Sequence, residues 1–166
     1  MTSQPVAVSH IETPLGRIRA AASPFGIQEL GFVNDDEAHS VNDNHAEVHA
    51  GQAHLESLCD ELARYFAGES LQFTTPLDPE GTPFQHRVWD QLRAIPFGET
   101  VSYSALARRM SQPNAVRAVA RANAQNPIAI LIPCHRVIGA DGTLTGYAGG
   151  LDRKRALLEL EGVHRL

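Results

Sequence analysis

The chain has 166 residues, 43% of them hydrophobic and 20% charged, which suffices for one globular domain or two small ones sharing a core. No apolar run approaches the roughly 20 residues of a membrane-spanning helix, and the N-terminus lacks the basic start and apolar core of a secretory signal. With only two cysteines, the composition excludes a disulfide framework, argues against a structural zinc site and predicts a cytoplasmic protein.

The net charge of −5 conceals two halves of opposite sign. Residues 1–80 hold three basic against thirteen acidic residues, a formal charge of −10, whereas residues 81–166 hold eleven against six, or +5. A polyanionic partner is therefore open to the C-terminal half alone, although two differently charged solvated faces explain the same numbers. Prolines and a glycine near residue 80 predict a domain boundary there.

Residues 5–33 are predicted to form a small antiparallel sheet of about three strands, because β-prone runs are interrupted by the turn sequences TPLG and SPFG. Residues 34–51 are polar and acidic and are predicted as an exposed, partly mobile loop. Histidines within and just after this stretch could form a metal cluster, but they lack a partner thiol, and the composition favours a loop. These histidines are His39, His45, His49 and His54.

Residues 52–67 are predicted as an amphipathic helix that ends at Gly68. Its apolar positions recur at helical spacing and are Leu55, Leu58, Cys59, Leu62, Tyr65 and Phe66. Because Cys59 belongs to this stripe, we expect a buried, unreactive thiol there.

Residues 82–94 are predicted as a helix opened by a capping box, in which Thr82 caps, Pro83 is the first helical residue and Gln85 follows three residues after the cap. Trp89 lies on the apolar face of this helix. We therefore expect Trp89 in the core rather than as a platform for stacking bases.

Two short helices, at about residues 103–110 and 114–124, are separated by SQPN and have the length and spacing of a helix–turn–helix. The second helix is rich in alanine and carries Arg117 and Arg121 four residues apart, on one face. A slim helix with two arginines suits a nucleic-acid backbone. The alternative is that the alanines serve tight packing against a neighbouring helix. Short helix pairs are common in proteins, so the pattern alone does not decide for nucleic acid.

The sequence IPCHRV, residues 132–137, follows an apolar run that is predicted as a buried strand. A thiol attacks as the thiolate, so a catalytic Cys134 needs a base or positive neighbours, and His135 and Arg136 supply both types. Adjacent residues of an extended chain point in opposite directions, so His135 can assist Cys134 only if the backbone turns or a water bridges them. A buried structural thiol beside a surface histidine is the alternative for an arbitrary Cys-His pair.

The chain ends with a GADG turn, a glycine-rich loop GYAGG and a final helix at 153–161. Asp152 is predicted to cap this helix, and Gly162 to end it. The residues predicted to face inward are Leu157, Leu158 and Leu160.

In this order and spacing, NPIAILI, PCHRV, GYAGG and RALLELEG resemble the O6-alkylguanine-DNA alkyltransferases. The likeness runs from about Gly81 to the end and is highly specific, whereas residues 1–80 match in general plan only. The resemblance implies an α+β fold, with an N-terminal domain of small antiparallel sheet plus helix (residues 1–80) and a mostly α-helical DNA-binding and active-site domain with a helix–turn–helix (residues 81–166).

The resemblance also implies DNA repair by direct reversal, in which the alkyl group of O6-alkylguanine passes irreversibly to the protein in a single turnover. The base is flipped out through the minor groove of duplex DNA, and O4-alkylthymine is a further candidate substrate. The implied partner is alkylated double-stranded DNA, without membrane, metal or small-molecule cofactor. A monomer is implied, and cooperative binding on DNA stays open.

The resemblance implies a role for each matching residue. Cys134 is the acceptor nucleophile, and His135 draws its proton through a water. Glu161 orients that histidine, Tyr103 donates a proton to the departing guanine, and Asn126 braces the active-site loop. The implied DNA-binding residues are Arg117, which fills the space of the flipped base, and Ser102, Ala115, Ala118 and Arg121. The implied base pocket is formed by Tyr103, Val137, Tyr147, Ala148 and Gly149.

Some positions depart from the family pattern. Ala120 and Ala124 stand where members often have glycine, and Ala148 stands where some have serine, which removes a side-chain hydrogen bond to the base. The zinc ligands and the Cys-rich regulatory domain of some relatives are absent from this sequence.

Three alternative functions remain to be weighed. A non-catalytic lesion sensor of the alkyltransferase-like type has another residue at the nucleophile position, so Cys134 argues against it. A helix–turn–helix regulator would normally dimerise to read two half-sites, and no dimerisation helix is evident. A cysteine hydrolase needs an oxyanion hole and repeated attack by water, but it does not need the arginine-bearing helix.

Overall fold

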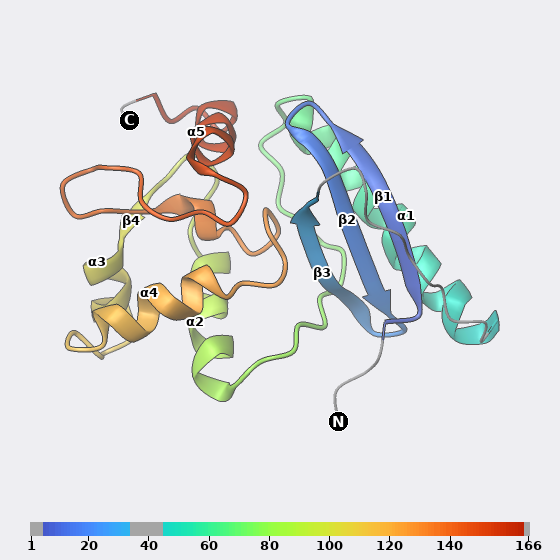
Figure 1. Ribbon diagram of the computed structural model, residues 1–166, viewed down its shortest axis with the longest axis horizontal. Coiled ribbons are helices and arrows are strands. Elements are labelled where there is room, and N and C mark those ends of the chain that lie inside the picture. Colours follow the sequence, from blue (N-terminus) through green and yellow to red (C-terminus); the bar gives the residue numbers. More distant parts are fainter. Residues whose placement is uncertain (1–4, 34–44, 165–166) are drawn as a thin grey trace. The chain divides into compact units, whose positions relative to one another are not determined.

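The computed structural model describes residues 5–33 and 45–164 of the chain. It consists of two compact units, Met1–Glu80 and Gly81–Leu166. Over the described residues, the first unit is a three-stranded sheet with one long helix, and the second consists of four α-helices, a short 3-10 helix and a two-stranded sheet (Figure 1). The predicted α+β class, with a helix–turn–helix in the second unit, is confirmed.

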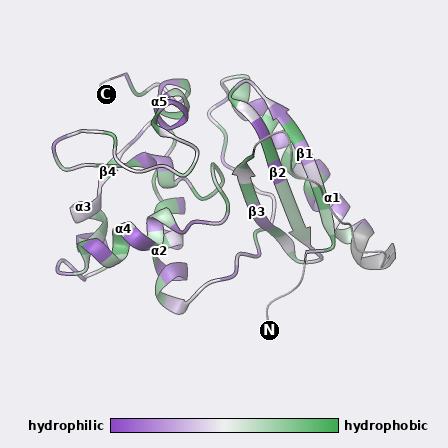
Figure 2. Ribbon diagram, in the orientation of Figure 1, coloured by the Kyte–Doolittle hydropathy of each residue, from purple (hydrophilic) through white to green (hydrophobic). Residues whose placement is uncertain are grey.

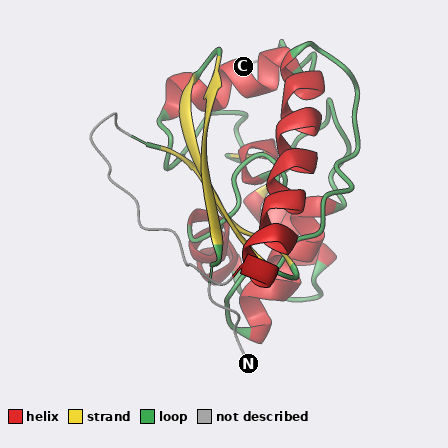
Figure 3. Ribbon diagram, turned by 90° about the vertical axis from the view of Figure 1, so that its right-hand side faces the viewer, coloured by secondary structure: helices red, strands yellow, loops and turns green. Residues whose placement is uncertain are grey.

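The sheet of the first unit is a meander of β1 (Ala7–Thr13), β2 (Gly16–Ser23) and β3 (Gly26–Phe32). Both neighbouring pairs are antiparallel, and the second has a register shift between Ala21 and Ala22. Helix α1 (His45–Phe66) runs beside the sheet and packs on β1 and β2 (Figure 3). The core of this unit combines residues of the sheet with the apolar stripe of the helix: Ile18, Ala20, Ala21, Ala22, Ile27, Leu30, Leu55, Leu58, Leu62 and Tyr65.

The predicted start of this helix at residue 52 is wrong, because α1 begins at His45. The predicted loop 34–51 is thus helical over its last seven residues, and residues 34–44 lie outside the described part. At Gly51 a Cβ would lie 3.0 Å from the side chains of Val6 and Ala7, so the glycine lets this part of the helix approach the start of β1. Cys59 is half-buried rather than buried, and burial followed by the charge of Glu56 raises its pKa.

The second unit begins with α2 (Pro83–Arg93), and its capping box is present as predicted: Gln85 N donates to Thr82 Oγ1, and Thr82 N donates to Gln85 Oε1. Trp89 is 2% exposed and donates its indole N–H to Ala122 O at 3.0 Å, which confirms its place in the core. Helix α2 thereby packs against α4, the second helix of the helix–turn–helix.

The helix–turn–helix consists of α3 (Tyr103–Arg109) and α4 (Val116–Ala124), which contact each other. Ser102 caps α3 by accepting a hydrogen bond from Ala105 N at 3.1 Å. Hydrophilic and hydrophobic residues alternate along both helices (Figure 2), as expected for elements with one buried face. On α4 the buried residues are Val119, Ala122 and Asn123.

The two short strands β4 (Val101–Ser102) and β5 (Val137–Ile138) pair in parallel. The pairing of Val101 with Val137 joins the start of the helix–turn–helix to the segment after Cys134. Strands of two residues have no usable periodicity, so the sequence did not predict this link.

Helix α5 spans Leu151–Leu160, and its N-cap is Gly150, without a side-chain cap. The prediction that Asp152 caps this helix is therefore wrong, because Asp152 lies within the first turn. Leu157 and Leu158 are buried as predicted, whereas Leu160 is only partly buried. Within the described part of the chain, no helix combines the length and apolarity needed to cross a membrane.

Candidate active site

The backbone around Cys134 turns rather than extends. Cys134–Arg136 form a short 3-10 helix (η1), and Pro133 at its N-cap has φ −81° and ψ 66°. The predicted strand before the cysteine is absent, because the chain turns at Ile130, whose φ is 71°. The short helix removes the objection that neighbouring side chains of an extended segment point apart.

Asn126 shapes this turn from the end of α4. Its Nδ2 donates to Ile132 O at 2.7 Å, and its Oδ1 accepts from Ile128 N at 3.0 Å. These two bonds replace the partners that a neighbouring strand would have provided to the apolar segment, although Ile128 and Ile132 are both buried. The amide of Asn126 also acts on the Cys134 thiol and lowers its pKa.

The thiol of Cys134 is half-buried in this turn. Burial raises its pKa above the usual value. The Asn126 amide, the positive charge of Lys154 and the backbone N–H groups of Cys134 and His135 oppose that rise without overcoming it. Cys134 is therefore a neutral thiol at rest, in surroundings that already contain donors and a positive charge for its thiolate.

His135 and Arg136 both bind the carboxylate of Glu161, the C-cap residue of α5. His135 Nε2 lies 2.6 Å from Glu161 Oε2, and Arg136 Nε donates to Glu161 Oε1 at 2.7 Å. Arg136 Nη1 also donates to Ile95 O at 2.7 Å. The cluster is buried, with His135 0%, Glu161 4% and Arg136 7% exposed.

The two partners set the protonation states of this cluster. Burial favours the neutral form of Glu161, but the hydrogen bonds and charges of His135 and Arg136 prevail and lower its pKa to about 2. Burial lowers the pKa of His135, and the Glu161 carboxylate opposes this only in part. The resting state is thus a carboxylate beside a neutral imidazole. With the proton of Nε2 directed to Glu161, Nδ1 is left as the basic nitrogen. That Nδ1 is buried without a hydrogen-bond partner among the described residues.

The residues predicted to form the base pocket come from three segments. Tyr103 opens α3, and its hydroxyl accepts a hydrogen bond from Thr145 Oγ1 at 3.3 Å, which brings the loop before α5 to the helix–turn–helix. Val137 is buried in β5.

In the loop before α5, the Tyr147 hydroxyl is buried without a hydrogen-bond partner in the described part of the chain, whereas Ala148 is exposed. Burial raises the pKa of Tyr147, and the charge of Cys134 adds to this, which couples the phenol to the thiol. Gly149 accepts a hydrogen bond from Arg153 at 3.2 Å through its carbonyl.

The residues predicted to bind DNA lie mainly on the outer face of α4. Arg117, Ala118 and Arg121 are exposed there, and Ala115 is the partly buried N-cap residue. Ser102 is separate from this face, with its hydroxyl bound to Ala105 N and Ser104 Oγ.

Two functional candidates were missed or misplaced by the sequence reasoning. Arg136 was noted as a positive neighbour of the thiol, but its guanidinium binds Glu161 and Ile95 instead. The sequence also does not predict the place of Lys154, which is fully buried and donates to Val137 O at 2.7 Å and Thr145 O at 2.6 Å. Its position three and four residues before the buried Leu157 and Leu158 is the helical signal that could have identified it.

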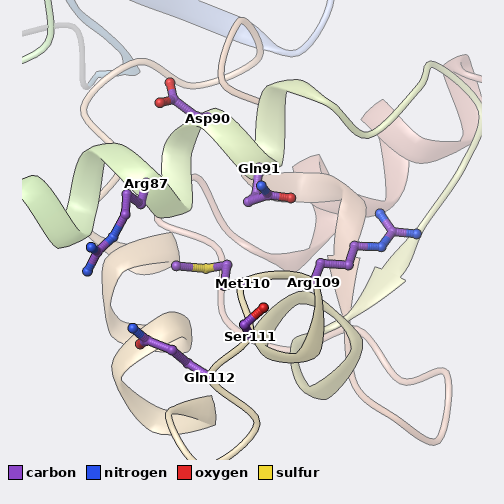
Figure 4. A pocket seen from close by; sticks show the side chains of 7 residues that line it. All are labelled: Arg87, Asp90, Gln91, Arg109, Met110, Ser111 and Gln112. Carbon is purple, nitrogen blue, oxygen red and sulfur yellow. The ribbon is translucent and has the colours of Figure 1, made fainter.

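A cavity of about 320 Å³ lies elsewhere on the second unit, between α2 and the end of α3 (Figure 4). Its lining residues are Arg87, Asp90, Gln91, Arg109, Met110, Ser111 and Gln112. Arg87 and Arg109 point to opposite sides of it, and it contains no thiol or imidazole. Across residues 5–33 and 45–164, no three histidine, cysteine or acidic side chains are grouped so as to hold a metal ion.

Comparison with known proteins assigns both units. Residues 83–163 match the family described as "6-O-methylguanine DNA methyltransferase, DNA binding domain", and residues 6–79 match its "ribonuclease-like domain". A methylated-DNA–protein-cysteine methyltransferase of Methanosarcina acetivorans is 46% identical over 91% of this chain and 95% of its own. The chain belongs to the 6-O-methylguanine DNA methyltransferase family.

Mycobacterial members of the 6-O-methylguanine DNA methyltransferase family are also similar. The Mycobacterium bovis protein of the same name is 61% identical over 61% of this chain and 62% of its own. The crystal structure of Mycobacterium tuberculosis OGT in complex with DNA covers 94% of this chain and 92% of its own, at 44% identity and a TM-score of 0.81.

Proposed function

We propose that this protein repairs DNA by moving the alkyl group of O6-alkylguanine in duplex DNA onto Cys134, and that residues 81–166 perform both binding and chemistry. The observation that supports this most strongly is that the residue next to Cys134 in the turn is a fully buried histidine bound to a carboxylate, with Nε2 of His135 2.6 Å from Glu161 Oε2. The names of the relatives agree with this reaction.

His135 is the base in this proposal. Its free Nδ1 accepts the thiol proton through one bridging water, and Glu161 stabilises the imidazolium that forms. Arg136 keeps Glu161 ionised and in place through its bond to Oε1 and its anchor on Ile95. The buried carboxylate thus supplies the charge that a buried imidazole needs in order to accept a proton.

The transfer itself is an in-line displacement. The Cys134 sulfur forms a bond to the alkyl carbon as the bond from that carbon to guanine O6 breaks, and the electron pair of the broken bond stays with the guanine. Tyr103 donates a proton to the departing base, so the base leaves as neutral guanine. Tyr103 loses a proton and His135 holds the proton taken from the thiol, so the net charge of the site does not change. The products are an alkyl thioether and unmodified guanine.

The target atom lies inside a base stack, so the nucleotide must be extruded into the pocket at a cost of a few kcal/mol. We assign Arg117 to the space that the base leaves, because it projects from a helix slim enough to enter a minor groove. The formal charge of +5 on residues 81–166 supports binding through phosphate contacts. A family member, OGT of Mycobacterium tuberculosis, has been solved in complex with DNA.

A thioether is a poor leaving group, so the product on Cys134 is permanent and each chain acts once. O4-alkylthymine presents the same alkyl-oxygen chemistry and is a second proposed substrate. The two free cysteines suit a reducing cytoplasm, and the reaction requires only one chain.

The stoichiometry of repair tests the proposal. A duplex with one O6-methylguanine is titrated with protein, and the restored guanine is counted at completion. We expect one guanine per chain, with no further repair on longer incubation. Repair in excess of the protein would contradict single turnover, lesion binding without repair would indicate a sensor, and ester or peptide hydrolysis would indicate a cysteine hydrolase.

A further inference from the structure

Lys154 is a buried cation without a carboxylate. It lies on α5, is 0% exposed, and its Nζ donates to Val137 O at 2.7 Å and Thr145 O at 2.6 Å. A primary ammonium has three N–H donors, so two carbonyls leave one donor over. Burying an ammonium with neutral partners alone is costly, and burial lowers the pKa of Lys154 to about 8.

The charges of Glu161 and Arg136 offset each other within the site. Glu161 is bound by Arg136 and His135, and the imidazole is neutral at rest. Arg153, on the same helix, donates to Gly149 O and acts on Tyr147. No acidic side chain of the described residues forms an ion pair with Lys154. Glu161 and Arg136 cancel, so Lys154 and the partly exposed Arg153 leave this region positively charged while Cys134 is a thiol, and formation of the thiolate removes one unit of that charge.

The two carbonyl partners show why the ammonium stays at this place. Val137 follows the cysteine helix directly, and Thr145 belongs to the loop that also bonds Tyr103. Lys154 thus connects α5 to the strand that follows the reacting thiol and to the loop that reaches Tyr103. The charges of Lys154 and Cys134 act on each other in both directions, raising the pKa of the lysine and lowering that of the cysteine.

We propose that Lys154 is a positioning residue whose buried ammonium, held by Val137 O and Thr145 O, is the counter-charge for the Cys134 thiolate. His135 removes the proton, and Lys154 stabilises the anion that remains. The purpose of this arrangement rests on the proposed function, but the electrostatic claim does not depend on DNA. When the sulfur becomes a neutral thioether, the ammonium of Lys154 no longer has a negative charge to balance it.

The test is the pH dependence of Cys134 alkylation by iodoacetamide, in which the thiolate displaces iodide to form a thioether. Peptide mapping by mass separates Cys134 from Cys59, which serves as an internal control. Lys154→Met should move the midpoint for Cys134 upward by about one pH unit, the usual effect of one nearby charge, and leave Cys59 unchanged. Lys154→Arg retains the charge and should restore the midpoint toward wild type. An unchanged midpoint in folded Lys154→Met would overturn the proposal.

A second measurement covers the case in which Lys154→Met does not fold. Coupling between two sites is reciprocal, so the pKa of Lys154, followed by NMR of its ¹³Cε, should be lower in Cys134→Ser than in the wild-type protein. Equal values in the two proteins would overturn the proposal. Neither measurement uses alkylated DNA. A protein that shows the shifts without repairing DNA would therefore reject the proposed function while retaining the role of Lys154, and the reverse result would do the opposite.

Discussion

Among the residues that the structure describes, each unit buries one glutamate to 4% exposure, and the two carboxylates have different partners. Glu61 on α1 accepts hydrogen bonds from the backbone N–H and hydroxyl groups of Thr74 and Thr75, including Thr74 N at 2.7 Å and Thr75 N at 2.8 Å. Glu161 accepts from His135 and Arg136. Burial alone would raise the pKa of each, and in each case the partners lower it instead.

The difference lies in the partners. The threonines cannot change charge. Glu61 therefore anchors residues 74 and 75 to the helix but has no partner among the described residues that could exchange a proton with it. His135 can gain a proton and is the neighbour of a thiol in the chain, so in the proposed mechanism the same kind of carboxylate belongs to a proton path. A buried acid is therefore a sign of function only when one of its partners can titrate and reaches a reactive group.

The largest effect should come from the two thiols. Cys134→Ser should abolish methyl transfer and leave binding to alkylated duplex close to wild type, because a serine hydroxyl beside the same base is far less nucleophilic than a thiolate. Cys59→Ser should leave transfer unchanged. Transfer assays and DNA-binding titrations on both variants check this, and a parallel loss of binding in Cys134→Ser would make that residue structural.

The next effect separates the two glutamates directly. Glu161→Gln should slow transfer by about 10²-fold, the typical contribution of a positioned acid–base system. Glu61→Gln should leave transfer by the folded protein unchanged and lower the free energy of unfolding by about 1–3 kcal/mol, since buried donors lose their charged acceptor. Single-turnover rates and urea unfolding of both variants are the measurements. Equal slowing in the two variants would remove the distinction between the units.

Acid should reveal the same carboxylate in the stability of the wild-type protein. The pKa of Glu161 is about 2 in the folded state against an ordinary 4.5, so its contribution is present above pH 4.5 and is lost as pH falls towards 2. This difference corresponds to about 3 kcal/mol. His135, whose folded pKa is lowered, acts in the same direction from about pH 6.5 downward, because only the unfolded state gains its proton. The free energy of unfolding, measured with urea between pH 6 and 3, should depend less on pH in Glu161→Gln than in the wild-type protein. An equal dependence on pH in the two proteins would contradict the assignment.

The smallest effect concerns the charge difference between the units. Arg117→Ala should weaken binding of lesion-containing duplex by about tenfold, since one positioned arginine contributes about 1–3 kcal/mol. Arg64→Ala, which removes an exposed arginine paired with Glu69 in the acidic unit, should leave binding unchanged. Binding titrations at two salt concentrations measure the affinity of both variants for the duplex. An equal loss of affinity in the two variants would contradict binding of DNA at the face of α4 that carries Arg117.

Much of the fold could be predicted because its elements are periodic. The stripe of Leu55, Leu58 and Leu62 predicted α1, and Thr82 and Gln85 predicted the start of α2. The segment before Cys134 could not be predicted in the same way. A short apolar run fits a strand as well as a buried turn, and the side-chain bonds of Asn126 decide for the turn.

The candidate site was predicted less evenly. The resemblance implied roles for Cys134, His135 and Glu161. It did not indicate that Arg136 and His135 share the carboxylate of Glu161. Lys154 was missed because a lysine in a helix of mixed charge is usually solvated. Its burial depends on two carbonyls from distant parts of the chain, which local sequence does not encode.

The most direct test of the central claim is the mass of the intact protein after mixing with a duplex that contains one O6-methylguanine, followed by peptide mapping. The account predicts a gain of one methyl group per chain on the peptide that carries Cys134, with guanine restored in the DNA. A methyl group on Cys59, or lesion binding without any gain in mass, would contradict it.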